Sequence, residues 1–163
     1  MYFARFDSPL GEITVYSDGA ALCALHLVGQ KHGIPNGAAE EKADLPLFSA
    51  IEKWLKDYFA GEWPETDAIP LAPQGSEFQK LIWGYLREIP CGETVTYGAL
   101  AARAAKEMGK KAMSAQAVGG AVGRNPVSII VPCHRVVGAN GKLTGYDGGL
   151  DKKIWLLKHE KTR

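Results

Sequence analysis

One stretch of this chain carries the side chains for nucleophilic chemistry. Cys133, His134 and Arg135 are consecutive and lie inside the mostly apolar run 129–137. A thiol attacks only as the thiolate, and a free thiol is mostly protonated near neutral pH. A neighbouring imidazole base and a cationic guanidinium both favour the thiolate. A buried cysteine at the end of a core strand would give the same local sequence, so the rest of the chain must decide between the two.

Composition describes an ordinary globular protein that forms one large domain or two small ones. The 163 residues are 46% hydrophobic and 23% charged. The first seven residues alternate like a strand and lack the apolar region of a signal peptide. No apolar run is long enough to span a bilayer. The three cysteines, Cys23, Cys91 and Cys133, are odd in number and far apart. We therefore expect a reducing, cytoplasmic setting.

The net charge of +1 hides a division between the two halves of the chain. Residues 1–73 contain 5 Lys/Arg and 11 Asp/Glu, a formal charge of −6, whereas residues 74–163 contain 14 and 7, a formal charge of +7. A basic half joined to an acidic half favours a polyanionic partner such as nucleic acid for the second half. A chance imbalance would give the same numbers, so charge alone leaves both interpretations open.

The first half is predicted to contain strands followed by a helix. Alternation and turn residues predict strands over 2–6, 12–17 and 20–27, and an irregular loop over 28–44. A helix of about fifteen residues follows, with apolar side chains at helical spacing, and Gly61 ends it. These side chains are Phe48, Ile51, Leu55, Tyr58 and Phe59. The proline-rich segment 62–75 is predicted to be a stiff linker, which divides the chain into domains 1–73 and 74–163.

The second half is predicted to be mostly helical. Ser76 opens a capping box for a helix that ends before Pro90. Thr96 can cap a short helix from Tyr97 to about Ala105, and Ser114 can cap another from Ala115 to about Val122. Two short helices joined by a basic connection indicate a helix-turn-helix unit. A terminal amphipathic helix is expected from the spacing of three apolar residues, Leu150, Ile154 and Leu157.

The helix predicted at 115–122 has almost no side-chain bulk. It contains Gly119 and Gly120, and each glycine inside a helix costs roughly 1 kcal/mol relative to alanine. Close approach of the backbone to another surface would compensate for that cost. The surface could be a neighbouring helix or the groove of DNA, and composition does not distinguish them.

Five motifs in order resemble one protein family, the O6-alkylguanine-DNA alkyltransferases. The resemblance covers residues 76–160 closely and residues 1–73 more weakly. The motifs are Thr96-Tyr97-Gly98, Ala117-Val118-Gly119-Gly120-Ala121, Asn125-Pro126, Val131-Pro132-Cys133-His134-Arg135-Val136 and Gly145-Tyr146-Asp147-Gly148-Gly149-Leu150.

The resemblance implies a fold and an activity. The fold is α+β: a small N-terminal α/β domain with an antiparallel sheet and a helix, ribonuclease H-like, and a mostly helical C-terminal domain with a winged-helix-like helix-turn-helix. The activity is irreversible transfer of an alkyl group from O6-alkylguanine in DNA, and from O4-alkylthymine, to a cysteine of the protein. Each molecule acts once and needs no cofactor. The implied partner is double-stranded DNA bearing O6-alkylguanine, and the implied state is a monomer that associates with the nucleoid.

The resemblance also assigns roles to five residues. Cys133 is the alkyl acceptor, and His134 acts as its base through a water. Glu160 orients His134 and balances its charge, which is the nucleophile, base and orienter logic of a triad. Tyr97 contacts the flipped base and assists its protonation. Asn125 ties the site together by hydrogen bonds.

The target atom lies inside the DNA stack, so the base must be extruded into a pocket. The resemblance implies that the helix-turn-helix does this from the minor groove. The implied DNA-contacting residues are Thr96, Ala115, Gln116, Ala117, Gly119 and Arg124. The implied pocket residues are Val136, Tyr146 and Asp147, with Arg135 supporting the site.

The sequence departs from the family pattern at Gln116. The family usually has an arginine there, which is inserted into the stack in place of the flipped base. Glutamine can still hydrogen-bond an orphaned cytosine but has no charge to attract phosphates. Lys110 and Lys111 are candidates for compensating that loss. Some members also hold zinc, but Cys23, His26 and His32 offer at most three ligands where a tetrahedral site needs four. We therefore expect no metal.

Three other functions compete with alkyl transfer. Alkyltransferase-like proteins bind alkylated bases without repairing them, but they lack the cysteine that stands here at position 133. A helix-turn-helix regulator would explain the basic half and leave the Pro-Cys-His-Arg run unexplained. A thiol hydrolase would use the same cysteine and histidine, although no oxyanion site is evident in the sequence.

Overall fold

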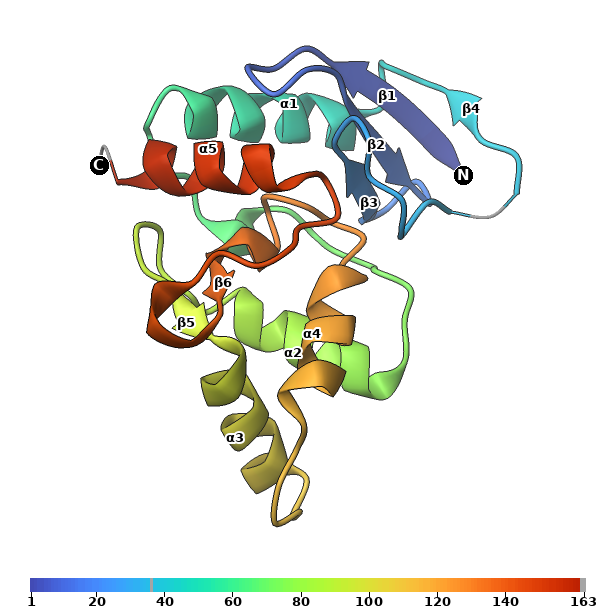
Figure 1. The fold of residues 1–163 in the computed structure, drawn as a ribbon. Coiled ribbons are helices and arrows are strands. Elements are labelled where there is room, and N and C mark those ends of the chain that lie inside the picture. Colours follow the sequence, from blue (N-terminus) through green and yellow to red (C-terminus); the bar gives the residue numbers. More distant parts are fainter. Residues whose placement is uncertain (36, 162–163) are drawn as a thin grey trace.

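The computed structural model describes residues 1–35 and 37–161, which form a sheet layer and a helical layer (Figure 1). The first half contains β1 (Tyr2–Phe6), β2 (Ile13–Ser17), β3 (Leu22–His26), β4 (Glu40–Glu41) and α1 (Pro46–Phe59). The strands form one sheet in the order β3-β2-β1-β4. β1 and β2 are antiparallel, with Tyr2 opposite Ser17 and Phe6 opposite Ile13. The mixed α+β class predicted from the sequence is confirmed.

The sheet differs from the expected one at its outer edge. Residues 28–44 were predicted to be a loop, but Glu40 and Glu41 form β4 and pair in parallel with β1. The sheet is therefore mixed and not purely antiparallel. A strand of two residues contains no periodicity, so neither alternation nor composition could have revealed it.

The other edge of the sheet connects the two halves of the chain. All five residues of β3 are buried. The backbone N–H of Leu25 donates to the carbonyl of Pro126 at 2.9 Å, and the N–H of Ser128 donates to the carbonyl of Leu25 at 3.1 Å. Leu71, in the segment predicted to be a linker, pairs with Leu22 on the same edge. The proline-rich segment is thus packed against the sheet, and it also contains the 3₁₀ turn η1 (Thr66–Ala68).

The second half is built from helices and two very short strands. It contains α2 (Glu77–Leu86), β5 (Val95–Thr96), α3 (Tyr97–Glu107), α4 (Ala115–Gly123), β6 (Val136–Val137) and α5 (Leu150–Glu160), with the 3₁₀ turns η2 (Cys133–Arg135) and η3 (Ala139–Gly141). β5 and β6 pair in parallel. The three predicted caps are present: Ser76 with its capping box, Thr96 and Ser114.

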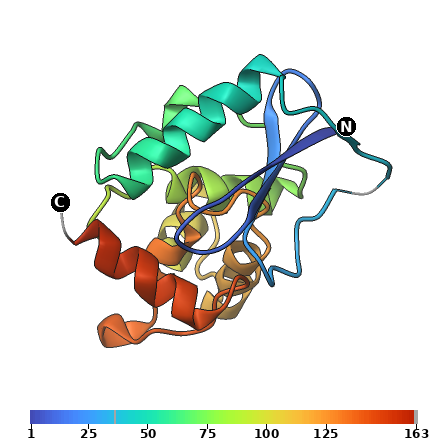
Figure 2. The ribbon, with the colours of Figure 1, turned by 90° about the horizontal axis from the view of Figure 1, so that it is seen from above.

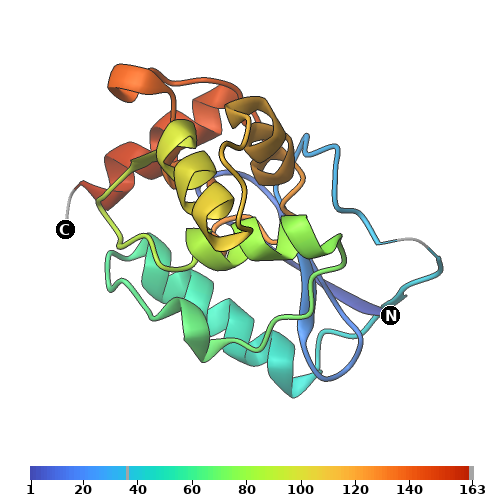
Figure 3. The ribbon, with the colours of Figure 1, turned by 90° about the horizontal axis from the view of Figure 1, so that it is seen from below.

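α2, α3 and α4 pack together below the sheet (Figures 1 and 3). Val118, Ala121 and Val122 form the buried face of α4. Trp83 of α2 donates its indole N–H to the carbonyl of Ala121 at 2.8 Å. This packing fixes α4 while leaving its glycines on another face.

α5 returns to the first half, where its C-terminal part meets the C-terminal end of α1 (Figures 1 and 2). The rings of Phe59 and Trp155 lie 5.8 Å apart, and a ring nitrogen of His159 lies 2.8 Å from the carbonyl oxygen of Tyr58. The buried residues of α5 are Lys153, Leu156 and Glu160. The predicted apolar stripe was therefore wrong, since Leu150 is 42% exposed and the buried face carries two charged residues. In the described part of the chain, no helix is long and apolar enough to cross a membrane.

Candidate active site

Cys133 begins the turn η2, directly after a buried irregular segment. Residues 127–132 are buried but form no helix or strand, and Ile129 adopts a left-handed conformation with φ of 69°. Cys133 is 7% exposed and lines a cavity of about 770 Å³. Its thiol is therefore placed at the wall of a space large enough for a small molecule, and it is not sealed in the core.

Asn125 holds the segment that leads into η2. Its side-chain N–H groups donate to the carbonyls of Val127 at 3.2 Å and Val131 at 2.8 Å. Its Oδ1 accepts from the N–H of Val127 at 3.0 Å. Because the side chain is buried, these bonds replace the secondary-structure pairing that the irregular segment lacks.

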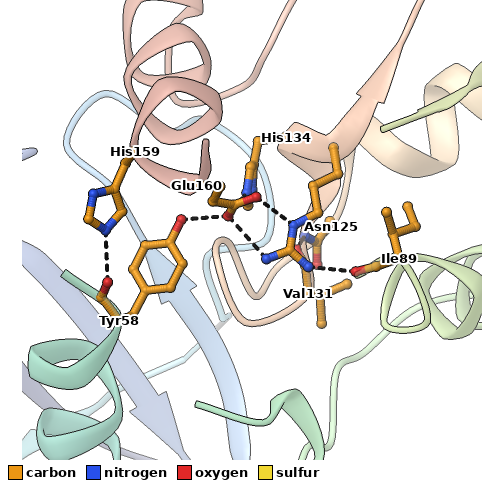
Figure 4. A network of polar contacts seen from close by, with 8 residues as sticks. Tyr58, Ile89, Asn125, Val131, His134, His159 and Glu160 are labelled. Carbon is orange, nitrogen blue, oxygen red and sulfur yellow. Dashed lines mark hydrogen bonds and ion pairs between the residues drawn. The ribbon is translucent and has the colours of Figure 1, made fainter. Parts of the chain in front are cut away.

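A buried charged network is centred on Glu160 (Figure 4). His134 Nε2 lies 2.6 Å from Glu160 Oε2, and both side chains are almost fully buried. Arg135 Nε donates to Oε1 at 2.7 Å, and Arg135 Nη2 donates to Oε2 at 3.0 Å. The Tyr58 hydroxyl in α1 donates to the same Oε2 at 2.6 Å. One carboxylate thus organises side chains from η2 and from the first half of the chain.

The network keeps Glu160 ionised. Burial alone would raise the pKa of Glu160, but the hydrogen bonds and charges of His134 and Arg135 hold that pKa far below its ordinary value. An ionised carboxylate only accepts hydrogen bonds, so the ring proton of a neutral His134 belongs on Nε2. The other ring nitrogen, Nδ1, is then an acceptor.

His134 is set up as a neutral base. Burial lowers its pKa, although Glu160 opposes that shift. Among the described residues, no side chain or backbone group forms a hydrogen bond with His134 Nδ1, which is buried. A buried acceptor of this kind is normally satisfied by a water molecule. The imidazole can therefore take a proton at Nδ1 while Glu160 stabilises the resulting cation.

Burial raises the pKa of Cys133, and three neighbours oppose that shift. They are Asn125, Tyr146 and Lys153. Lys153 is fully buried in α5, and its Nζ donates to the carbonyl of Val136 at 2.7 Å. Arg135 was expected to favour the thiolate by its positive charge. Instead it binds Glu160 and the carbonyl of Ile89. The cation that favours the thiolate is Lys153.

The cavity is walled by one face of α4 and by the segment 144–147. Besides Asp147, six of the residues predicted to contact DNA or the base line it: Tyr97, Ala115, Gln116, Gly119, Arg124 and Tyr146. Two of the lining residues are hydrogen-bonded to each other, since Thr144 Oγ1 donates to Tyr97 Oη at 3.3 Å. Asp147 also lines the cavity, but its carboxylate is hydrogen-bonded to residues 31 and 32.

Other predicted residues lie outside this wall. Thr96 accepts from the N–H of Ala99 at 3.0 Å and caps α3. Val136 is buried in β6 and contributes its carbonyl to Lys153. Ala117 is exposed on α4, and Arg135 faces the network around Glu160. These four residues are not among those that line the cavity.

The glycines of α4 are not explained by helix packing. A Cβ placed on Gly120 would meet nothing within 4 Å, and one on Gly119 would meet the Tyr97 ring at an ordinary 3.8 Å. Close packing occurs instead at Ala121. Of the two interpretations of this helix, the structure thus favours an open face that another molecule can approach. Within the described residues, no three His, Cys, Asp or Glu side chains are grouped closely enough to hold a metal.

Two family models together match nearly the whole chain. The model described as 6-O-methylguanine DNA methyltransferase, DNA binding domain, matches residues 77–162. The model described as 6-O-methylguanine DNA methyltransferase, ribonuclease-like domain, matches residues 1–73. The chain belongs to the 6-O-methylguanine DNA methyltransferase family. The resemblance noted from the sequence motifs is confirmed.

Relatives and solved structures agree with this family. The methylated-DNA–protein-cysteine methyltransferase of Methanosarcina acetivorans is 48% identical over 98% of each chain. That of Haemophilus influenzae is 40% identical over 99% of this chain and 87% of its own. The crystal structure of Mycobacterium tuberculosis OGT in complex with DNA matches with a TM-score of 0.85 and 40% identity, over 99% of this chain and 94% of that one.

Sequence reasoning missed two side chains in the site of this methyltransferase. Tyr58 was assigned to the core face of its helix, and nothing in its surroundings indicated a contact 102 residues away. Lys153 lies in the terminal helix, which was predicted only from its apolar residues. A signal was present, since Lys153, Leu156 and Glu160 follow the i, i+3, i+7 spacing of one helical face. That face was overlooked because two of its three members are charged.

Proposed function

We propose that this protein repairs O6-alkylguanine in DNA by moving the alkyl group to Cys133. The observation that carries the proposal is the placement of the thiol. Cys133 lies on the wall of a cavity that small residues of α4 also line, and the adjacent His134 forms a buried pair with Glu160. The membership of the chain in the methyltransferase family supports the same reaction.

The chemistry follows from the network. The Cys133 thiol gives its proton, through a bridging water, to Nδ1 of His134, and Glu160 stabilises the imidazolium. The thiolate then attacks the alkyl carbon in line with the carbon–oxygen bond. A carbon–sulfur bond forms, the carbon–oxygen bond breaks, and its electron pair stays on guanine. Lys153 and Asn125 favour the thiolate in a site whose burial opposes it.

The leaving guanine needs a proton. Tyr97 begins α3 and its hydroxyl reaches the cavity, where it contacts Thr144. We assign Tyr97 the contact with the flipped base and the assistance of its protonation. The thioether on Cys133 has no route to hydrolysis, so each molecule reacts once. The protein itself is the acceptor, and the reaction needs no cofactor.

DNA would be bound by the helix-turn-helix formed by α3 and α4. The open face of α4 lets the backbone approach a groove, and the extruded base enters the cavity beside it. We assign to Gln116 and Arg124 the contact with the duplex beside the flipped nucleotide, because both line the cavity at the two ends of α4. Ala115, Ala117 and Gly119 leave room for the approach, and Thr96 fixes the start of α3.

The remaining assignments concern organisation. Residues 1–73 are the supporting domain and residues 74–163 the DNA-binding and alkyl-acceptor domain. We infer that the protein acts as a monomer in the cytoplasm, at the nucleoid when it is bound to DNA. One helix-turn-helix unit can bind a DNA duplex without a second copy of the protein.

Intact mass measurement tests the proposal. The protein is mixed with double-stranded DNA that contains one O6-methylguanine. We expect the mass to rise by one methyl group in place of a proton, and peptide mapping to place that group on Cys133. An unchanged mass with tight binding would show a binding module instead. Repeated turnover with regenerated thiol would show a hydrolase.

A further inference from the structure

The N-terminal half contributes one wall of the cavity. Of the described residues that line it, His32 alone precedes Tyr97 in the chain. His32 lies in the connection between β3 and β4, and its side chain is 42% exposed. The reaction outlined above gives this residue no role, although it faces the same space as Cys133.

Asp147 fastens His32 to the opposite side of the cavity. Asp147 Oδ2 accepts from the backbone N–H of Lys31 at 3.1 Å and from that of His32 at 2.8 Å. Asp147 Oδ1 lies 3.1 Å from His32 Nδ1. One largely buried carboxylate therefore bonds three groups of a segment more than a hundred residues away in the sequence.

The same segment is attached at other points. We name residues 27–33 the docking segment. Gln30 Oε1 accepts from the Ser128 hydroxyl at 2.8 Å, and Lys152 Nζ donates to the carbonyl of Val28 at 2.8 Å. Gly33 has a φ of +83° and lies close to Pro126. A Cβ on Gly33 would lie only 2.6 Å from the Cα of Pro126. The docking segment therefore has a defined position against the C-terminal half.

The segment that carries Asp147 is also held at two other points: the Thr144 hydroxyl donates to Tyr97 Oη at 3.3 Å, and the carbonyl of Gly148 accepts from Lys152 Nζ at 2.9 Å. Residues 144–149 form no helix or strand, and three of the six are glycines. Glycine leaves the backbone many conformations, so such a segment needs anchors to keep one of them. Asp147 supplies three hydrogen bonds of that kind, all to the docking segment.

We propose that the contact between His32 and Asp147 sets the width of the base cavity and thereby the size of the alkyl group that the protein accepts. This inference rests on the proposed function and adds a specificity element to it. Asp147 is a positioning residue, because it holds the segment that carries Tyr146. His32 forms the wall itself. Releasing the contact lets the 144–149 segment move outward, which favours bulky alkyl groups over methyl.

The test compares two alkyl groups on the same DNA. Single-turnover alkylation of Cys133 is followed by intact mass, with saturating duplexes that carry O6-methylguanine or O6-benzylguanine at one position. The measured quantity is the ratio of the benzyl rate to the methyl rate, in which an effect on DNA affinity cancels. The proteins are the wild type, Asp147→Ala, His32→Ala and Asp57→Asn. The last removes one carboxylate from an exposed ion pair with Lys53.

We expect the ratio to rise at least roughly fivefold in Asp147→Ala, because the variant removes three hydrogen bonds and the net contribution of a single one corresponds to about that factor. His32→Ala keeps the two backbone bonds to Asp147 and should raise the ratio as well. The double variant should raise the ratio by less than the product of the two single-variant factors, because both residues belong to one contact. Asp57→Asn should keep the wild-type ratio.

A ratio that stays the same or falls in both single variants overturns the proposal. An equal loss of both rates also overturns it, since that result indicates support of the fold alone. Thermal melting of each variant identifies a protein that no longer folds, and His32→Ala then decides the question. Failure of the proposed function itself looks different, because the wild type would gain mass from neither duplex.

Discussion

The Tyr58 hydroxyl in α1 donates a hydrogen bond of 2.6 Å to Glu160 Oε2 at the end of α5. The same oxygen lies 2.6 Å from His134 Nε2, so a side chain of the N-terminal half holds the carboxylate that orients the base (Figure 4). Tyr58 is 2% exposed, and burial together with Glu160 raises its pKa far above the ordinary value. It therefore stays protonated and acts as a donor at all relevant pH values.

Tyr58→Phe should weaken both the fold and the reaction. A hydrogen bond to a charged group contributes about 2 kcal/mol, and we expect the free energy of unfolding to fall by about that amount. The Glu160 carboxylate then has one restraint fewer, so alkylation of Cys133 should slow. Denaturant unfolding and single-turnover alkylation measure the two effects. Tyr16→Phe, in β2, is the matched control. Unchanged values for both quantities in Tyr58→Phe would show that this bond does not matter.

Cys133→Ser should abolish alkyl transfer and retain binding to alkylated DNA. A serine hydroxyl is far less acidic than a thiol and gives no comparable nucleophile. The cavity and the face of α4 stay as they are. Intact mass and a binding titration with O6-methylguanine DNA measure the two properties, with Cys91→Ser as the control. Residual transfer in Cys133→Ser would mean that another thiol is the acceptor.

Glu160→Gln should slow alkylation strongly. The amide cannot stabilise the imidazolium of His134, so the pKa of Cys133 rises further and less thiolate forms. Arg135 also loses its charged partner in a buried site, which should lower the free energy of unfolding by about 3 kcal/mol. Single-turnover rates at several pH values separate the effects, because a higher pH restores part of the thiolate. Glu88→Gln, in an exposed pair with Arg103, is the control. An unchanged rate would remove Glu160 from the mechanism.

The free energy of unfolding should decrease as the solution is acidified. The folded-state pKa values of both His134 and Glu160 lie below their ordinary values. The unfolded chain then binds more protons than the folded one, so the stability of the folded state decreases as pH falls. The loss should begin below about pH 6.5 through His134 and continue below about pH 4.5 through Glu160, and the two groups titrate as a coupled pair.

Denaturant midpoints between neutral pH and pH 4 measure this effect. His134→Asn should remove only part of the loss in the upper range of pH, because burial also lowers the pKa of His26. A wild-type midpoint that is constant over the whole range would contradict the assignment of a buried neutral imidazole.

The contiguous motifs allowed much of the site to be predicted, because residues that are close in sequence also lie close together in the fold. Cys133 and His134 are adjacent, and Asn125 reaches the same turn from six residues before Val131. Tyr58 could not be predicted in the same way, because its contact with Glu160 depends on how α1 packs against the rest of the chain. The spacing of Lys153 and Glu160 did place both residues on one face of α5, but only the fold shows that this face is buried.

The helices were predicted more closely than the strands. A helix such as 97–107 has a cap and several turns of periodicity, so two independent signals agree. β4, β5 and β6 have two residues each, and their pairing depends on partners elsewhere in the fold. The family resemblance implied that Asp147 lines the base pocket, and Asp147 does line the cavity. Its hydrogen bonds to the docking segment were not predicted, because that contact exists only when the N-terminal half is folded against the C-terminal half.

Gln116→Arg should strengthen DNA binding. Gln116 lies in the first turn of α4 and lines the cavity, where an added guanidinium can reach phosphates and the space left by the flipped base. One further phosphate contact should raise the affinity roughly tenfold at moderate salt and steepen the salt dependence by about one ion. Gln74→Arg, at an exposed position outside the cavity wall, controls for the added charge.

The same titrations test whether Lys110 and Lys111 compensate for the missing arginine. Both lie in the turn between α3 and α4 and are exposed. If they supply the phosphate contacts, changing both to alanine should weaken binding more in the wild type than in Gln116→Arg. An equal loss in the two backgrounds would mean that the lysines act independently of position 116. If Gln116→Arg gains no affinity, glutamine at this position already supports DNA binding as well as arginine does.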